Sequence, residues 1–193
     1  MIEAFNSSHV NAMAQLHLDN LTGLLCDLGP GAVHAYYHGA TRSSSAVGYV
    51  YIQESGLSGF VFGSANPRQL KREILANSFF QTLLGTCSGV IRKPGTLHSI
   101  LSSIWPGSED YDSQAAELIY LAVDVNQRSS GIGQQLVECF SHKLSKSDVR
   151  AYELSVDADN QEAIKFYDRL GFVEVNQYRE FGNDHKRYRM VLA

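Results

Sequence analysis

The chain has 193 residues, 44% of them hydrophobic, and a formal net charge of −4. This predicts one globular domain, residues 1–193, and excludes the clustered basic face of a nucleic-acid binder. No apolar run reaches the length of a membrane span and no leader segment opens the chain, so we expect a soluble, cytoplasmic protein without a membrane partner.

The first part of the chain predicts helices followed by a β-hairpin. One helical face carries residues at the appropriate spacing: Val10, Met13, His17, Leu21, Leu24, Leu25 and Leu28. Gly29-Pro-Gly31 is expected to end this helix, and residues 32–38 form a further turn or two. Residues 46–53 and 58–63 are rich in Val, Tyr, Ile and Phe, which predicts a hairpin around Gly56.

Residues 66–115 are predicted to be largely helical. Asn66 is a suitable N-cap and Pro67 a suitable first residue for a helix that runs to about Leu84. A second helix is indicated by apolar residues at Leu97, Ile100, Leu101, Ile104 and Trp105. Residues 107–115 are acidic and polar, and we expect a loop there.

The second half alternates strands and helices. Strands are predicted at 117–124 and 150–156, each followed by a helix, at 131–145 and 160–170. Two more strands, at 172–181 and 185–192, flank Gly182-Asn-Asp. This order predicts a mixed α/β fold with hairpins at both ends and βαβ units in between.

The junction between the first strand of this half and its helix is a candidate phosphate site. Residues 118–124 read Leu-Ile-Tyr-Leu-Ala-Val-Asp, an apolar run typical of a buried strand. Gly131 and Gly133 stand where the helix begins, and the first N–H groups of a helix have no intrahelical partner. Neither a P-loop nor the G-x-G-x-x-G pattern is present, because Leu136 occupies the last glycine position. On this motif alone, a plain glycine-initiated helix remains an equal alternative.

A second motif resolves the ambiguity. From Asn160 the chain follows the pattern Asn-x-x-Ala-x-x-Phe-Tyr-x-x-x-Gly-Phe, and the first junction follows Arg-x-x-Gly-x-Gly from Arg128. In this order and at this separation, the two motifs resemble those of the GNAT superfamily of acetyl-CoA-dependent N-acetyltransferases. The clear match covers 116 to about 175, and residues 1–115 match only loosely.

The resemblance implies a mixed, mostly antiparallel seven-stranded sheet flanked by helices. Its strands 4 and 5 are expected to splay apart and admit acetyl-CoA, the co-substrate. The chain departs from the family at residues 66–115, because a helical insertion stands where members have a short connection between strands 3 and 4. The insertion either shapes the acceptor pocket or joins two copies of the chain in a homodimer, and the sequence leaves both open.

The resemblance also implies which residues bind acetyl-CoA. The pyrophosphate is expected at the start of the helix, on the backbone of Arg128, Ser129, Ser130, Gly131, Ile132, Gly133 and Gln134. The pantetheine arm is expected to pair with the backbone of Leu121, Ala122 and Val123. The side chains of Leu121 and Val123 can pack in the core at the same time. Asn160 is expected to cap its helix and to contact the same arm.

Tyr167 is the candidate general acid. A phenol with an ordinary pKa of about 10 is protonated at neutral pH and can donate a proton to a departing thiolate. Family members use a tyrosine at this motif position for that purpose. The alternative is a core aromatic residue, since Ala163, Ile164 and Leu170 share its helix face.

Glu117 is the candidate general base. Residues 116–123 are similar to the strand that carries the base in histone-type members of the family, and a carboxylate at a partly desolvated strand end has a raised pKa. A solvated charge at the end of a strand is an equal alternative. A subgroup that uses a glutamate in strand 5 would have it where this chain has Ser155, which weakens the case for that mechanism. The backbone N–H of Val123 is the expected oxyanion donor.

The predicted function is therefore direct transfer of an acetyl group from acetyl-CoA to a primary amine in a ternary complex. The acceptor, a small molecule or a peptide, is left open. Two alternatives remain: a non-catalytic acyl-CoA-binding or regulatory module on the same fold, and an interaction protein that uses the insertion. Cys26, Cys87 and Cys139 are expected to be free thiols, and the His34/His38 pair lacks a third ligand, so no metal site is predicted.

Overall fold

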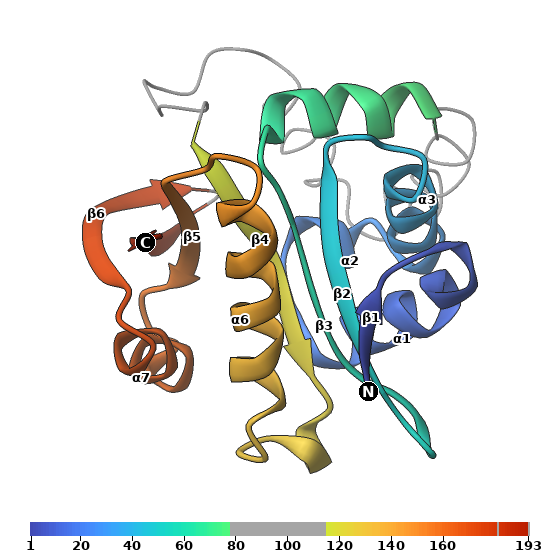
Figure 1. Cartoon of the computed structure of the whole chain (residues 1–193), viewed down its shortest axis with the longest axis horizontal. Coiled ribbons are helices and arrows are strands. Elements are labelled where there is room, and N and C mark those ends of the chain that lie inside the picture. Colours follow the sequence, from blue (N-terminus) through green and yellow to red (C-terminus); the bar gives the residue numbers. More distant parts are fainter. Residues whose placement is uncertain (78–114, 181, 193) are drawn as a thin grey trace.

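The computed structural model describes residues 1–77, 115–180 and 182–192. They form one seven-stranded sheet in the order β1-β2-β3-β4-β5-β7-β6 (Figure 1). Its strands are β1 (Ile2–Ala4), β2 (Ala46–Gln53), β3 (Gly56–Ser64), β4 (Ala116–Val123), β5 (Ala151–Asp157), β6 (Val173–Glu180) and β7 (Asn183–Val191). Only the β4–β5 pairing is parallel. The predicted fold class is confirmed.

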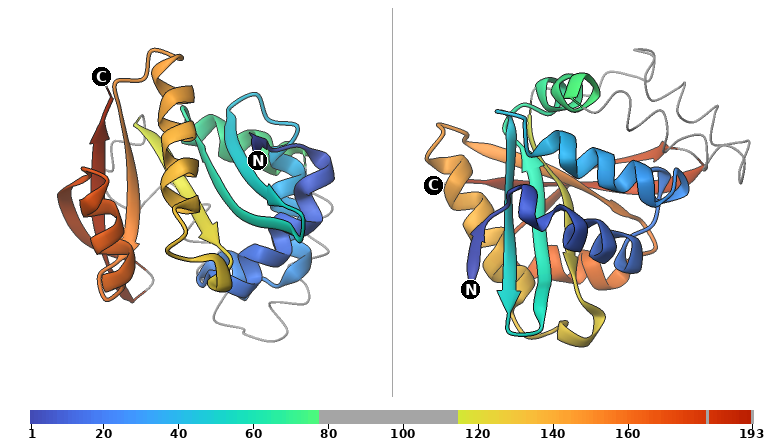
Figure 2. Two further views of the ribbon diagram at one scale, coloured as in Figure 1. Left: turned by 60° about the horizontal axis from the view of Figure 1, so that its bottom comes forward. Right: turned by 90° about the vertical axis from the view of Figure 1, so that its right-hand side faces the viewer.

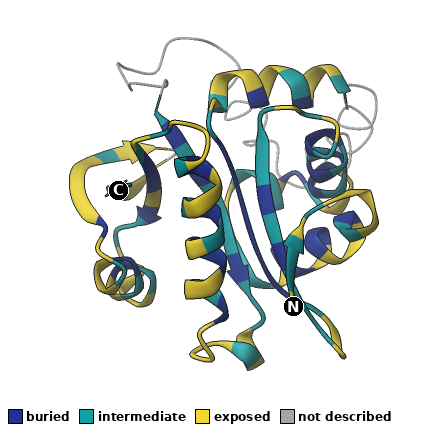
Figure 3. Cartoon of the chain, in the orientation of Figure 1, coloured by how far each residue is buried: buried dark blue, intermediate teal, exposed yellow. Residues whose placement is uncertain are grey.

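Helices cover both faces of the sheet, with a hydrophobic core under each layer (Figure 2). On one face lie α6 (Ile132–Ser145) and α7 (Gln161–Arg169), whose apolar residues pack with those of β4 and β5. On the other lie α1 (Val10–Asn20) and α3 (Pro30–Ala40), which pack mainly on β3 and β4. At the edge of the sheet next to β7 lies β6, which is exposed along most of its length (Figure 3).

The N-terminal helix is shorter than predicted. Instead of one helix to Leu28, α1 ends at Asn20, Leu21 is extended, and a short α2 spans Leu24–Asp27. Gly23, which precedes α2, has a φ of 109°, a backbone conformation that a helix cannot contain. The apolar spacing continues through this break, which explains the error. Pro30 begins α3 in addition to ending the preceding segment.

The other predicted strands and helices that lie wholly in the described residues agree with the structure to within two residues at each end, whereas β1 was not predicted. β1 has three residues, too few for a periodic pattern, and pairs with β2. Two short 3₁₀ turns are also present, η1 (Ser7–His9) and η2 (Val125–Gln127).

After β3 a helix covers 67–77, and the Asn66 side chain caps it by accepting from the Gln69 N–H. The predicted continuation of that helix to Leu84, the predicted helix at 97–105 and Cys87 lie outside the described residues.

The cysteines, the histidine pair and the helices bear on the predicted metal and membrane features in the described part of the chain. There, Cys26 and Cys139 are free thiols. The His34 and His38 rings stack, but no group of three ligand-type side chains gathers among these residues. None of the described helices has both the length and the apolar character needed to cross a membrane.

A β-bulge in β4 shapes the centre of the sheet. Phe62 of β3 pairs with Tyr120, but the next residue, Gly63, pairs with Leu118, so Ile119 is an extra residue on β4. Ile119 and Tyr120 both contact the core under α1 and α3, whereas Leu118 and Leu121 contact the core under α6. The bulge therefore changes which residues of β4 face each layer.

Immediately before the bulge, the pairing between β4 and β5 stops. It consists of Ala116 with Tyr152 and Glu117 with Glu153. Beyond these two pairs the strands diverge, although β4 continues to Val123 and β5 to Asp157 (Figure 1). The predicted splay of strands 4 and 5 is thus present, and it begins at Glu117.

Gly63 is required for the close approach of β3 to this point. A Cβ at Gly63 would lie 2.1 Å from the carbonyl oxygen of Glu117 and 2.7 Å from Cζ of Phe140. We therefore predict that Gly63→Ala lowers the free energy of unfolding by about 2 kcal/mol or more, because rigid backbone must move. Gly48→Ala is the control, since the atom that its Cβ meets first belongs to the Phe5 ring. Urea unfolding of both variants measures the difference, and equal losses would contradict the prediction.

Candidate functional site

The divergence of β4 and β5 opens a cleft of about 600 Å³. Its walls come from the second half of β4, the loop before α6, the first turn of α6 and one face of α7. The end of α1 contributes Asn20 and Leu21. The predicted residues on its walls are Leu121, Ala122, Val123, Arg128, Ser129, Gly131, Ile132, Gly133, Gln134, Asn160 and Tyr167.

The start of α6 supplies free backbone donors to this cleft. Gly131, its N-cap, adopts a left-handed conformation with φ 82° and ψ 0°, and no side chain caps the helix. The preceding Ser129 also has a positive φ, of 62°. Because the first N–H groups of α6 lack a side-chain acceptor and lie at the positive end of the helix dipole, this turn suits a phosphate or pyrophosphate group. Ser130 is absent from the cleft walls, and its hydroxyl donates to the Gln127 carbonyl oxygen.

The edge of β4 that faces the cleft is open. Beyond Glu117, β4 has no strand partner on its β5 side among the described residues. Leu121, Ala122 and Val123 all line the cleft along this edge. Ala122 packs under α1 and α3, while Leu121 and Val123 contact the core under α6. The backbone of this edge can therefore pair with an extended ligand while the side chains stay in the two cores.

Asn160 and Tyr167 stand at opposite ends of α7. The Asn160 side chain accepts from the Ala163 N–H at 3.1 Å, so it caps the helix as predicted and also lines the cleft. Tyr167 is 7% exposed and packs edge-to-face against Phe166 and Phe172. Burial raises the pKa of its phenol above the ordinary value, which keeps the group protonated at neutral pH. Tyr167 is thus a core aromatic residue that lines the cleft and carries a protonated phenol.

Charged residues near the α7 end of the cleft were only partly predicted. Arg128 donates to Glu162 at 3.4 Å across the gap between the loop and α7. Arg169 lines the same cleft but was not predicted. Arg169 occupies a variable position of the second motif, so the motif gave no indication that this residue lines the cleft. Leu21 was missed because the break after α1, which brings it to the cleft, is not visible in the apolar spacing.

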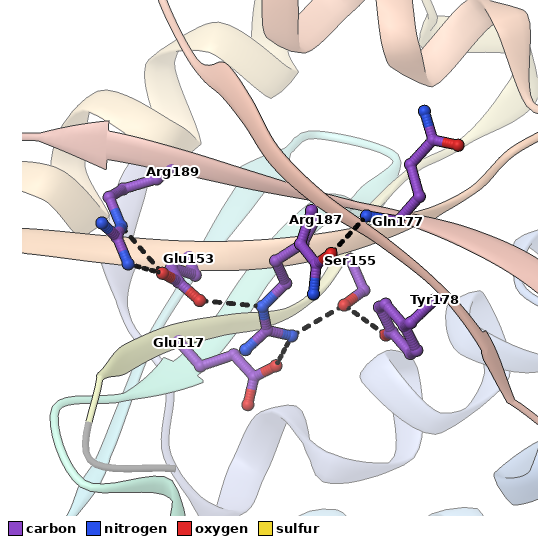
Figure 4. A network of polar contacts seen from close by, with 8 residues as sticks. Glu117, Glu153, Ser155, Gln177, Tyr178, Arg187 and Arg189 are labelled. Atoms are coloured by element: carbon purple, nitrogen blue, oxygen red, sulfur yellow. Dashed lines mark hydrogen bonds and ion pairs between the residues drawn. The ribbon is translucent and has the colours of Figure 1, made fainter. Parts of the chain in front are cut away.

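Glu117 lies outside the cleft walls, at the vertex of the splay. Its Oε1 is 2.9 Å from an Nη of Arg187, whose Nε contacts Glu153 at the same distance (Figure 4). Burial raises the pKa of Glu117 to about 7, with smaller contributions from the negative charges of Glu153 and Glu180. The guanidinium of Arg187 acts in the opposite direction, because it stabilises the carboxylate.

The network around Glu117 occupies the sheet face opposite α6 and α7. Ser155 accepts hydrogen bonds from Arg187 and from the Tyr178 hydroxyl, each at 2.7 Å. Arg189 contacts the second oxygen of Glu153. Sequence reasoning missed Glu153, Arg187 and Tyr178. Two period-two polar patterns contained the signal: Glu153, Ser155 and Asp157 on β5, and His185, Arg187 and Arg189 on β7.

Comparison with known proteins agrees with this geometry. Residues 34–172 match the model of the acetyltransferase (GNAT) family. Similar solved structures include the ribosomal-protein-alanine N-acetyltransferase from Brucella melitensis, with a TM-score of 0.64, 14% identity, and coverage of 100% of this chain and 99% of that one. Another is NAA60 of Arabidopsis thaliana in complex with acetyl-CoA, with a TM-score of 0.60, 18% identity, and coverage of 99% and 97%. At these identities the likeness shows the fold alone. No curated protein sequence matches the chain significantly.

The turn before α6 can be tested directly by ligand binding. Gly131→Val forces a β-branched residue to a φ of 82°, which should distort the turn and weaken acetyl-CoA binding at least tenfold. Gly182→Val is the matched control, because Gly182 has a φ of 87° in the β6–β7 turn and open space around it. Isothermal titration should show a higher Kd for the first variant alone. Equal affinities in the two variants would remove the turn from the ligand site.

Proposed function

The chain belongs to the acetyltransferase (GNAT) family, which uses acetyl-CoA, and on this premise we propose that it transfers the acetyl group directly to a primary amine in a ternary complex. The observation that carries the proposal is that Tyr167 lines the same cleft as the uncapped start of α6. We also propose that residues 1–193 form one domain, which includes the insertion at 66–115.

Acetyl-CoA would supply a thioester, whose carbonyl carbon accepts the amine and whose sulfur leaves as a thiolate. The backbone at the start of α6 would hold the pyrophosphate, and the open edge of β4 would hold the pantetheine arm. Ser130 contributes through its backbone, since its hydroxyl is engaged within the loop. The N–H of Val123 is the proposed donor to the oxyanion. Direct transfer requires no nucleophilic thiol, and none lines the cleft among the described residues.

Tyr167 and Glu117 are the proposed acid and base. Tyr167 keeps its proton at neutral pH and would donate it to the thiolate. Glu117, with a pKa of about 7, would accept the ammonium proton, through water, from an acceptor that approaches on the α1 and α3 side. Tyr120 lies on this side of β4 and Tyr36 on α3 facing it, with the two rings 5.9 Å apart.

The acceptor remains open between small amines, amino sugars and protein amino groups. A non-catalytic acyl-CoA-binding module on the same fold is the second candidate, and it predicts binding without turnover. Tyr167 on the cleft wall favours turnover, since binding alone does not need a phenol there. A homodimer formed through residues 66–115 is compatible with either function, and sedimentation of the full chain tests it.

We predict that Tyr167→Phe lowers kcat by about 100-fold or more and leaves the Kd for acetyl-CoA unchanged, because the variant lacks only the acidic proton. Thiol release with an amine panel measures kcat. Tyr152→Phe is the control: Tyr152 is buried in the same core, but its hydroxyl contacts Ser141 and lies outside the cleft lining. Equal rates for Tyr167→Phe and the unmodified chain would exclude the phenol as the acid.

A further inference from the structure

We propose that Arg187 is a positioning residue for the transfer reaction: it acts through Glu117, favouring the ionised form of this carboxylate and fixing its orientation where β4 and β5 separate. The inference rests on the proposed function for its role in turnover. The charge coupling between the two side chains is a property of the folded chain and can be measured independently of turnover.

The contacts of Arg187 connect three strands. The residue belongs to β7, and β5 lies between β7 and β4 in the sheet. Its guanidinium extends over β5, donating through Nε to Glu153 of that strand and through an Nη to Glu117 of β4 (Figure 4). Only 5% of the Arg187 side chain is exposed, against 6% for Glu153 and 24% for Glu117. Arg187 therefore binds both carboxylates in a setting that water screens poorly.

A cation is needed at this point because two carboxylates are placed side by side. Glu117 and Glu153 are direct partners in the parallel β4–β5 pairing, so their side chains leave the sheet on the same face. A negative charge in this position disfavours a second one beside it. Burial and the negative charges of Glu153 and Glu180 disfavour ionised Glu117, and Arg187 opposes them. Burial lowers the pKa of Arg187 itself to about 10, which leaves it charged at neutral pH.

Within the part of the chain that the structure describes, the other titratable groups that face Glu117 do not provide this cation. Tyr36 of α3 and Tyr120 of β4 feel its charge, and burial raises the pKa of both phenols, which keeps them neutral. From β6, Tyr178 contacts Ser155, and burial raises its pKa as well. These three phenols stay neutral near the carboxylate, and Arg187 supplies the positive charge.

Orientation is the second part of the role. The Nη of Arg187 that binds Glu117 also donates to Ser155, whose hydroxyl is in turn fixed by Tyr178. A guanidinium is planar, so fixing Nε and one Nη fixes the direction from which Glu117 is held. A lysine in its place carries the charge but cannot bridge both carboxylates in this geometry.

Arg189 provides a matched comparison. It lies two residues further along β7, on the same face, and contacts Glu153 at 2.8 Å, but it is half exposed and has no ion pair with Glu117. If Arg187 only neutralised charge on this face, Arg187→Gln and Arg189→Gln would affect Glu117 alike. If Arg187 acts through direct contact, only the first substitution has a large effect.

The closing experiment follows the Glu117 carboxyl carbon by NMR as a function of pH in the full chain and in both variants. Glu117→Gln identifies the resonance. We expect Arg187→Gln to raise the Glu117 pKa by about one unit or more, the size of effect an adjacent opposite charge produces, and Arg189→Gln to shift it by less than half as much. Arg187→Lys retains a positive charge and should give a Glu117 pKa between those of the unmodified chain and Arg187→Gln. This variant replaces Arg187→Gln in the experiment if the glutamine variant does not fold.

The pH dependence of kcat/KM provides the catalytic readout. The base must be ionised, so activity rises with pH through the Glu117 pKa, and Arg187→Gln should move this rise to higher pH with recovery above it. A loss of activity that is equal at every pH, with an unmoved Glu117 titration, would overturn the inference while leaving acetyl transfer intact. A moved titration without acetylation of any amine would overturn the role in turnover together with the proposed function.

Discussion

The pairing of β4 with β5 stops after two residues, and the rest of the site depends on this interruption. A parallel pair that continued to Val123 would fill the cleft with backbone hydrogen bonds and leave no open edge. The extra residue at Ile119 helps to explain why the pairing stops, because a bulge bends its strand and increases the local twist. Gly63 lets β3 stay close to β4 at this bend, so the sheet remains continuous on one side and divides on the other.

The same vertex separates two chemical environments. On the side of α6 and α7 lie free helix N–H groups and a buried phenol, which suit an anionic ligand and a retained proton. On the opposite face, a buried arginine lies among carboxylates. Burial raises the pKa of both Tyr167 and Glu117, but the consequences differ. The phenol of Tyr167 stays uncharged at neutral pH, whereas the pKa of the Glu117 carboxyl group comes close to 7, so that this group can titrate near neutral pH.

What the sequence predicted well was local. The N-cap at Asn160, the turn at Gly131 and the periodic strands and helices of the second half follow from residues close together in the chain. The break at Leu21 and Gly23 was missed because a regular apolar spacing continues through it. Arg187 was missed for another reason: its partners are 34 and 70 residues away, and nothing in the chain indicates that β7 lies beside β5. The fold, by contrast, was recovered through the family resemblance.

The brief β4–β5 pairing also bears on how the molecule comes apart. Residues 151–191 form a unit in which β5, β7 and β6 pair extensively with one another, while their backbone connection to the larger part of the sheet is limited to two residue pairs and reinforced by Arg187. Units of this kind can open without global unfolding, and their amide protons then exchange with solvent as a group. We therefore expect the C-terminal fifth of the chain to open as one cooperative unit, and its docking onto β4 and α6 brings together the side chains of the carboxylate network.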